Sequence, residues 1–179
     1  STRAYLLERG VLGTSIMWFE WADGQPLPPE AYRELCFSSV TTHDLPPTAG
    51  YLALEHVDVR ERLGLLTRPV EEERAQELHS IAAVGDAMKA RGLLAEGTDA
   101  SAYVEAMHAW MAQTPSRMLG YALADLVGDR RAVNQPGTNR EYPNWSVPLA
   151  GPDGQPLSLE EAMASPLAPR LAAALRGER

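Results

Sequence analysis

Apolar residues occur in the chain in two ways, as short continuous runs and as longer stretches with helical spacing. The runs at residues 11–19 and 37–42 are too short for ordinary helices and predict two strands. Because both runs are apolar almost throughout, we expect the strands to be parallel neighbours, buried on both faces. Between them, Pro-Pro-Glu at residues 28–30 predicts a short helix that reaches residue 35. A third run, at residues 118–127, fits either a strand or a helix on pattern alone.

The rest of the chain is predicted to be mainly helical. Apolar residues at helical spacing predict helices over residues 49–63, 71–91 and 99–113. Asp99 is a plausible N-cap for the third of these helices. Near the end of the chain, Ser158 followed three residues later by Glu161 has the spacing of a capping box. This pair predicts a last helix that runs to residue 175.

The order of these elements is strand, helix, strand, helices, possible strand, helix, which is a βα rhythm. Three strands cannot close a (β/α)8 barrel, which takes about 250 residues, and the chain has 179. The pattern therefore leaves two architectures open. The chain forms either a small open α/β sheet or the end of a larger barrel.

Composition excludes several classes of protein. The formal net charge is −8 and no basic cluster is present, so a nucleic-acid partner is not expected. No apolar run approaches the ~20 residues of a membrane span. Cys36 is the single cysteine, which rules out an internal disulfide, makes the cytoplasm the default location and suggests an inert buried residue. Ser1 opens the chain without an initiator methionine or a signal-peptide pattern, which suggests truncation or processing.

Three motifs carry a resemblance to a known family. Residues 39–51, SVTTHDLPPTAGY, resemble the block in amylomaltases that contains the last invariant carboxylate. Residues 134–138, NQPGT, followed by EYPNW at 141–145, are similar to a segment near the end of the same enzymes. GVLGT at residues 10–14, leading to Phe-Glu at 19–20, resembles the strand after their acid/base residue. The motifs follow the family's order, whereas residues around 68–97 match none of them and are interpreted as a helical insertion.

The resemblance implies a fold and a reaction. Amylomaltases are (β/α)8 barrels that transfer α-1,4-glucan segments between malto-oligosaccharides with retention of configuration, and no cofactor is implied. Residues 1–179 would form the C-terminal portion of that barrel, with strands six, seven and eight ending near Glu20, near His43 and in the 118–127 run. The resemblance thus favours a strand for that run.

Retention requires two carboxyl groups roughly 5–5.5 Å apart, a nucleophile and an acid/base. In the family both carboxyl groups precede the strand that begins near Val11. The resemblance therefore implies that both lie upstream of Ser1. We expect the isolated chain to be inactive.

The resemblance also assigns the candidate site residues. Asp44 corresponds to the third carboxylate, which stabilises the transition state, and His43 would donate a hydrogen bond to the same sugar. Substrate contacts are also expected from Glu20, which precedes this pair, and from four residues further along the chain: Asn134, Gly137, Thr138 and Trp145. Ordinary structural roles stay open for these residues, because Pro-Gly is a general turn signal and an aromatic after proline often anchors a loop.

Two other functions remain as alternatives. In the first, the chain is a glucan-binding or structural remnant without turnover. In the second, His43 and Asp44 are paired ligands of a metal-dependent phosphohydrolase of the His-Asp type. The second alternative needs a further histidine upstream, and none precedes His43. It also needs its ligands on helices, whereas this pair is predicted to end a strand. The other histidines lack metal-ligand spacing, so no metal site is expected.

Overall fold

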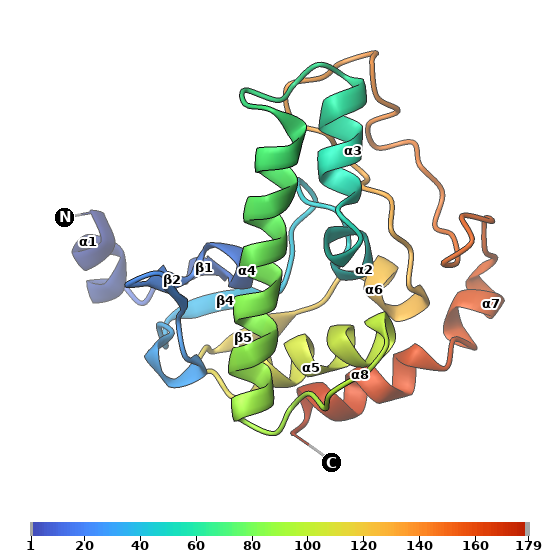
Figure 1. The fold of residues 1–179 in the computed structure, drawn as a ribbon. Coiled ribbons are helices and arrows are strands. Elements are labelled where there is room, and N and C mark those ends of the chain that lie inside the picture. Colours follow the sequence, from blue (N-terminus) through green and yellow to red (C-terminus); the bar gives the residue numbers. More distant parts are fainter. Residues whose placement is uncertain (1, 178–179) are drawn as a thin grey trace.

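The structure is a computed structural model that describes residues 2–177. A three-stranded sheet and a small hairpin lie beside a set of helices, of which α4 is the longest (Figure 1). In chain order the elements are α1 (Thr2–Glu8), β1 (Gly13–Ile16), η1 (Met17–Phe19), β2 (Trp21–Ala22), β3 (Gln25–Pro26), η2 (Pro29–Ala31), β4 (Cys36–Ser39), α2 (Thr48–Leu52), α3 (Glu55–Arg62), α4 (Val70–Ala90), α5 (Ala100–Ala112), β5 (Met118–Gly120), α6 (Leu123–Val127), α7 (Leu159–Met163) and α8 (Leu167–Leu175).

The main sheet is parallel, with the strand order β1-β4-β5. Gly13 pairs with Cys36 at one end of the β1–β4 ladder, and Ile16 pairs with Ser39 at the other. On the far side of β4, Phe37 pairs with Met118. The predicted parallel pairing of the first two strands is confirmed. Within residues 2–177 the outer edges of β1 and β5 have no strand partner, so the sheet is open and no barrel closes.

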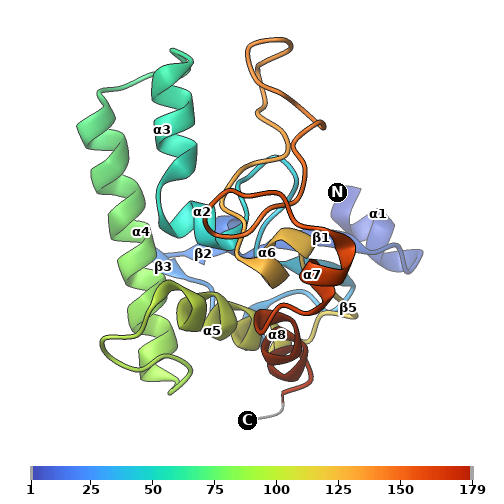
Figure 2. The same cartoon turned by 90° about the vertical axis from the view of Figure 1, so that its right-hand side faces the viewer.

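Helices α4 and α5 supply most of the core beneath this sheet. The core cluster joins residues after β1 and β4 to apolar side chains of the two helices, including Val84, Met88, Met107, Trp110 and Met111. Helix α8 packs on the other side of α5, and its Leu171 is fully buried. Figure 2 shows these helices after a quarter turn, with α8 beside α5 and nearer the viewer.

The two faces of the sheet are covered unequally, because one is buried along most of β1 and β4 whereas the other is buried at the Ile16–Ser39 row but open at the row before it. Ser15, Cys36 and Ser38 are buried. On the opposite face Thr14, Phe37 and Met118 form one register row, and all three are exposed. The expectation of burial on both faces is therefore wrong at this row, because the core helices α4 and α5 pack on the other side.

Both predicted strands are shorter than their apolar runs. The run at 11–19 gives β1 and then a 3-10 turn, η1, in which Met17 and Trp18 remain buried. The run at 37–42 gives β4, which begins at Cys36 and ends at Ser39. The helix predicted over residues 28–35 is only the 3-10 turn η2. Apolar character thus marks burial in these runs, but it does not fix backbone conformation.

Two predicted helices are each split in two. The helix predicted over residues 49–63 breaks into α2 and α3 at Leu54, which has a left-handed φ of 61°. The last helix breaks into α7 and α8 beside Pro166, which lacks the N–H that a continuous helix needs. The capping box of Ser158 and Glu161 is confirmed at the start of α7, and backbone N–H donation from Ser158 is the main cause that lowers the pKa of the Glu161 carboxyl.

The two middle helices are confirmed as α4 and α5. Asp99 caps α5, because its side chain accepts a hydrogen bond from the backbone N–H of Ala102 at 2.9 Å. The 118–127 run contains both elements that its pattern allowed, since β5 ends at Gly120 and α6 begins at Leu123. Along residues 2–177, none of the helices combines the length and apolar character that a membrane span needs.

Candidate functional site

His43 and Asp44 lie in a turn that begins a few residues after β4, at the carboxyl end of the parallel sheet. Their side chains remain open to solvent, with exposed fractions of 60% for His43 and 50% for Asp44. Nε2 of His43 is 3.4 Å from Oδ1 of Asp44. In parallel α/β proteins, ligands bind at this end of the strands, where neighbouring loops converge. The pair therefore occupies the position expected of a ligand-binding turn.

The turn is braced from within, although its two polar side chains face outward. Ser39 Oγ donates to the carbonyl of Thr41 at 2.8 Å, and Thr41 Oγ1 donates to the carbonyl of Pro46, also at 2.8 Å. Thr42 Oγ1 accepts the backbone N–H of Asp44 at 3.2 Å. These bonds use hydroxyl groups near the strand end to fix the backbone, which leaves the Asp44 carboxylate available for other partners.

A segment distant in sequence completes the site. Asn134 Nδ2 donates to Oδ1 of Asp44 at 2.6 Å. Trp145 lies beside His43, with the ring centroids 5.2 Å apart, and its side chain is 64% exposed. The structure thus brings together four predicted site residues: His43, Asp44, Asn134 and Trp145.

Trp145 adopts an unusual backbone conformation. Its φ is 60°, in the left-handed region, which costs a residue other than glycine roughly 1–2 kcal/mol. Its backbone N–H donates to the carbonyl of Val133 at 2.8 Å, which holds the strained residue in place. Strained residues gather at functional sites, where surrounding contacts maintain them. The exposed indole is thus kept beside His43 at a conformational cost.

Gly137 and Thr138 lie within the 134–145 loop, where their described contacts are internal to that loop. Gly137 has a φ of 84°, which a turn requires and glycine supplies. Thr138 Oγ1 donates to the carbonyl of Gln135 at 2.6 Å and lies 2.8 Å from Nδ2 of Asn144. Asn144 Oδ1 in turn accepts the backbone N–H of Gln135 at 2.8 Å. This geometry favours the structural interpretation for Gly137 and Thr138.

Glu20 contacts a different group of residues. It follows η1, and its carboxylate accepts a hydrogen bond from Ser15 and lies 3.8 Å from the Arg33 guanidinium. Arg33 also donates to the carbonyl of Thr14 at 2.6 Å. These contacts support the end of β1, and no described contact joins Glu20 to His43 or Asp44.

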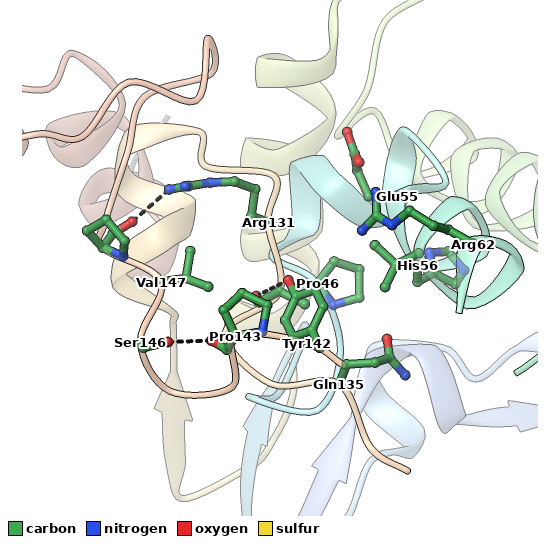
Figure 3. A pocket seen from close by; sticks show the side chains of 13 residues that line it. Pro46, Glu55, His56, Arg62, Arg131, Gln135, Tyr142, Pro143, Ser146 and Val147 are labelled. Atoms are coloured by element: carbon green, nitrogen blue, oxygen red, sulfur yellow. Dashed lines mark hydrogen bonds between the residues drawn. The ribbon is translucent and has the colours of Figure 1, made fainter. Parts of the chain in front are cut away.

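A pocket of about 420 Å³ lies behind the site, between α3 and the 142–148 loop. Figure 3 shows Glu55, His56 and Arg62 on one wall, with Tyr142 and Pro143 facing them. Tyr142 fixes this loop, since its buried hydroxyl donates to the carbonyl of Ala132 at 2.6 Å. In Figures 1 and 2 the loop rises at the same end of the molecule as the α3–α4 connection.

An aromatic stack forms the base of this region. The Trp18 and Tyr51 rings lie parallel at 3.9 Å, and Tyr51 and His56 stack at 4.3 Å. The Tyr51 hydroxyl donates to Glu77 at 2.7 Å. Burial, followed by the bond to Glu77, raises the pKa of Tyr51 well above its usual range, so the phenol stays protonated. The stack therefore links η1, α2, α3 and α4 without exposing a reactive group.

Sequence reasoning missed a buried polar cluster below the turn. Asp125 of α6 accepts two hydrogen bonds from Thr48, the first residue of α2, and lies next to His108 of α5. A signal for it existed, because Asp125 is the single charged residue in the 118–127 run. A lone carboxylate in a buried apolar stretch requires partners. Among residues 2–177, no group of three or more acidic, histidine or cysteine side chains is arranged to hold a metal ion.

Comparisons with known proteins point to one family. Residues 1–153 match the family described as 4-alpha-glucanotransferase. The 4-alpha-glucanotransferases of Mycobacterium tuberculosis and Mycobacterium bovis are each 55% identical to the chain over 181 residues, covering 97% of this chain and 25% of the relative. The amylomaltase of Corynebacterium glutamicum superposes with a TM-score of 0.91 at 38% identity, over 99% of this chain and 27% of that structure.

A more distant structure shares the fold. The amylomaltase of Streptococcus agalactiae, determined in complex with acarbose, superposes with a TM-score of 0.59 at 19% identity, over 98% of this chain and 29% of that structure. The chain spans about a quarter of the length of the curated relatives above. Its mixed α/β fold therefore corresponds to one part of an amylomaltase. On the match of residues 1–153, the chain belongs to the 4-alpha-glucanotransferase family, glycoside hydrolase family 77.

Proposed function

We propose that this chain supplies strands six to eight, with their helices, of a (β/α)8 barrel that transfers α-1,4-glucan segments between malto-oligosaccharides with retention. The parallel order β1-β4-β5 and the open edges of the sheet support this assignment. The observation that carries the proposal is Asp44, a half-exposed carboxylate at the carboxyl end of β4 that is held by Asn134 from a distant segment.

Asp44 stabilises the transition state in this proposal. Positive charge develops at the sugar ring as the glycosidic bond breaks. Hydrogen bonds from the sugar hydroxyls to a carboxylate become stronger as this charge grows. Oδ1 already accepts a bond from Asn134. This bond orients the carboxylate before the sugar arrives, while Oδ2 remains available to a hydroxyl. Such preorganisation avoids reorganisation during the reaction.

His43 and Trp145 provide contacts to the same sugar chain. The imidazole of His43 lies next to Asp44, so a nitrogen of the ring is placed to donate to a neighbouring hydroxyl. The exposed indole of Trp145 offers an apolar face against which a sugar ring packs. Asn134 contributes through its bond to Asp44, whereas Gly137, Thr138 and Glu20 act through structure: the first two shape the loop and the third supports β1.

The catalytic pair lies elsewhere in this proposal. The nucleophilic aspartate and the acid/base glutamate belong to the part of the barrel that precedes Ser1, so the chain alone performs no transfer. The remaining strands of the barrel would pair with the edges of β1 and β5 and cover the exposed row of Thr14, Phe37 and Met118. In their absence, edge-to-edge association of chains is expected, because unpaired strand edges invite pairing.

The test uses the full-length enzyme, meaning the longer protein that carries this chain, or a chimera in which the chain replaces the matched region of the C. glutamicum amylomaltase. Asp44→Asn keeps the shape of the side chain and removes its charge. We expect turnover to fall by about 10²–10³-fold, as for the loss of one oxyanion-hole donor, while maltotriose binding changes much less. Glucose release and oligosaccharide laddering from maltotriose measure turnover.

Asp153→Asn is the matched control, because Asp153 is an exposed loop carboxylate with no described contact to the site. The control should retain full turnover. Near-normal turnover of Asp44→Asn would reduce Asp44 to a structural role. Transfer by the isolated chain would mean that the catalytic pair is wrongly placed upstream of Ser1.

The alternatives predict different outcomes. A glucan-binding remnant would bind maltoheptaose but show no transfer even in the full-length enzyme. The phosphohydrolase alternative requires its His-Asp pair on a helix, whereas the structure places His43 and Asp44 in a turn after β4. That position argues against the alternative.

A further inference from the structure

The Asp125 carboxylate is fully enclosed in the interior of the protein. The residue is 1% exposed, and it belongs to α6, which follows β5. Its Oδ1 accepts the backbone N–H of Thr48 at 2.7 Å, and its Oδ2 accepts the Thr48 hydroxyl at 2.8 Å. Burying a carboxyl group is costly unless it is hydrogen-bonded, and this two-point contact with Thr48 supplies those bonds.

Asp125 caps helix α2, although it lies 77 residues further along the chain than Thr48. Thr48 is the first residue of α2, and the preceding Pro47 provides no side-chain cap. The first N–H groups of a helix have no partner within the helix. Asp125 supplies that partner from α6, so the start of α2 is fixed to an element that follows the next strand of the sheet.

A backbone contact reinforces this link. A Cβ atom added to Gly50 would lie 1.9 Å from the carbonyl oxygen of Arg130, so α2 packs directly against the backbone that follows α6. Thr48 and Gly50 therefore attach α2 to the 125–130 segment at two points. The two segments are thus held together by contacts in the interior of the protein.

The same two segments carry the halves of the exposed site. The chain leaves Asp44 and reaches Thr48 through Pro46 and Pro47, whose fixed φ angles leave few soft torsions. Beyond α6, the other segment continues to Asn134. The distance between the Asp44 carboxylate and the Asn134 amide therefore depends on the buried Thr48–Asp125 contact.

His108 completes the buried cluster. Its Nδ1 lies 2.8 Å from the carbonyl of Val104, so Nδ1–H donates there, and its Nε2 lies 3.4 Å from Oδ2 of Asp125. The ring is 1% exposed and closes the remaining side of the carboxylate. The groups that face Asp125 are thus Thr48 from α2 and His108 from α5.

We propose that Asp125 is a positioning residue for glucan transfer. Through Thr48 it holds the turn that carries Asp44, and it thereby keeps the Asp44 carboxylate within hydrogen-bond distance of Asn134. The inference rests on the proposed role of Asp44, and it adds a residue that touches no substrate. A displacement of about 1 Å at a catalytic group can cost on the order of 10²-fold in rate.

The first experiment compares three variants of the full-length enzyme. Asp125→Asn removes one acceptor, Thr48→Val removes the hydroxyl, and Thr48→Ser retains both donors. We expect kcat to fall by about 10–10²-fold in Asp125→Asn and Thr48→Val, while KM for maltotriose changes by less than about threefold. Thr48→Ser should keep the kcat of the unchanged enzyme. Thr48→Val tests the same contact if Asp125→Asn does not fold. Full kcat in folded Asp125→Asn or folded Thr48→Val overturns the proposal.

Glu73→Gln is the matched control for general loss of stability. Glu73 is a buried carboxylate, 4% exposed, that pairs with Arg60 and Arg68 away from the site. The control should lower the melting temperature and leave kcat unchanged at temperatures where the enzyme is folded. A fall in kcat equal to that of Asp125→Asn at matched stability would mean that the effect is general destabilisation, and the proposal would be wrong.

A double-mutant cycle separates positioning from structure. If Asp125 acts through Asp44, then Asp125→Asn should cost less than about threefold in kcat once Asp44→Asn is already present. Independent losses that multiply would contradict the inference. The same data distinguish the two proposals: an active Asp44→Asn enzyme removes the proposed function, whereas an inactive Asp44→Asn with a fully active Asp125→Asn removes only the positioning role.

Discussion

Two of the hydrogen-bonded contacts between the segment after β4 and the segment after β5 differ in almost every physical respect. Asn134 bonds to Asp44 at 2.6 Å, where the Asp44 side chain is half exposed. Thr48 bonds to Asp125 at 2.7 and 2.8 Å with both residues fully buried. The exposed contact contributes little stability but remains open to a ligand. The buried contact gives rigidity to a site that is itself open to solvent.

The largest effect is expected from the close packing beside the buried contact. Gly50→Ala places a methyl group 1.9 Å from the Arg130 carbonyl oxygen, which cannot move without shifting the backbone. We expect the free energy of unfolding to fall by about 3 kcal/mol. Urea unfolding of the 179-residue chain, followed by tryptophan fluorescence, measures this change.

Gly13→Ala is the control for Gly50→Ala. The nearest atom to its new Cβ would be Nη1 of Arg33 at 2.7 Å, the end of a flexible side chain that can move aside. Its effect should be much smaller than that of Gly50→Ala. Equal effects from the two alanines would show that α2 is not held by the close backbone approach at Gly50.

A smaller effect is expected where the loop on the exposed side is anchored. Tyr142→Phe removes a buried hydroxyl that donates to the Ala132 carbonyl, leaving that acceptor without its partner. We expect a loss of about 1 kcal/mol in the free energy of unfolding. Tyr121→Phe serves as the control, because Tyr121 is 52% exposed and removal of its hydroxyl should leave the free energy of unfolding unchanged. A neutral Tyr142→Phe would indicate that the loop is held mainly by its backbone bonds.

The smallest effect on stability is expected from the exposed contact. Asn134→Ala should change the free energy of unfolding by no more than about 0.5 kcal/mol, because the bond it removes is at the surface. In the full-length enzyme the same change should lower kcat about tenfold, since Asp44 loses its orienting donor. Gln135→Ala, which removes a neighbouring amide bonded to the Pro136 carbonyl, is the control. A large loss of stability in Asn134→Ala would contradict the conclusion that the exposed contact contributes little to stability.

Much of the fold could be predicted from local patterns. The helices α4 and α5, the Asp99 cap and the Ser158–Glu161 capping box depend on residues within a few positions of one another. The parallel pairing of β1 and β4 followed from apolar runs separated by a helical signal. His43 and Asp44 were expected at the end of the second strand, and they lie in the turn that follows it, although the strand itself ends earlier, at Ser39.

What the sequence did not show depends on contacts between distant segments. The break at Leu54 is an example, because nothing in its local sequence favours a left-handed residue. The break is needed because Gly50 of α2 packs against Arg130, whereas His56 of α3 stacks on Tyr51. The bonds within the loop that contains Gly137 and Thr138 likewise depend on how residues 134–145 fold. Local spacing cannot distinguish a loop that binds sugar from one that bonds to itself.

The separation of Thr48 and Asp125 has a consequence for biosynthesis. The two residues are 77 positions apart. At translation rates of about 5–20 residues per second, Asp125 is added roughly 4–15 s after Thr48. During that interval the start of α2 has no cap, and the turn that carries Asp44 is tethered on one side only. Helices α4 and α5 are made in the same interval, so the core beneath the sheet can form before the candidate site acquires its final geometry.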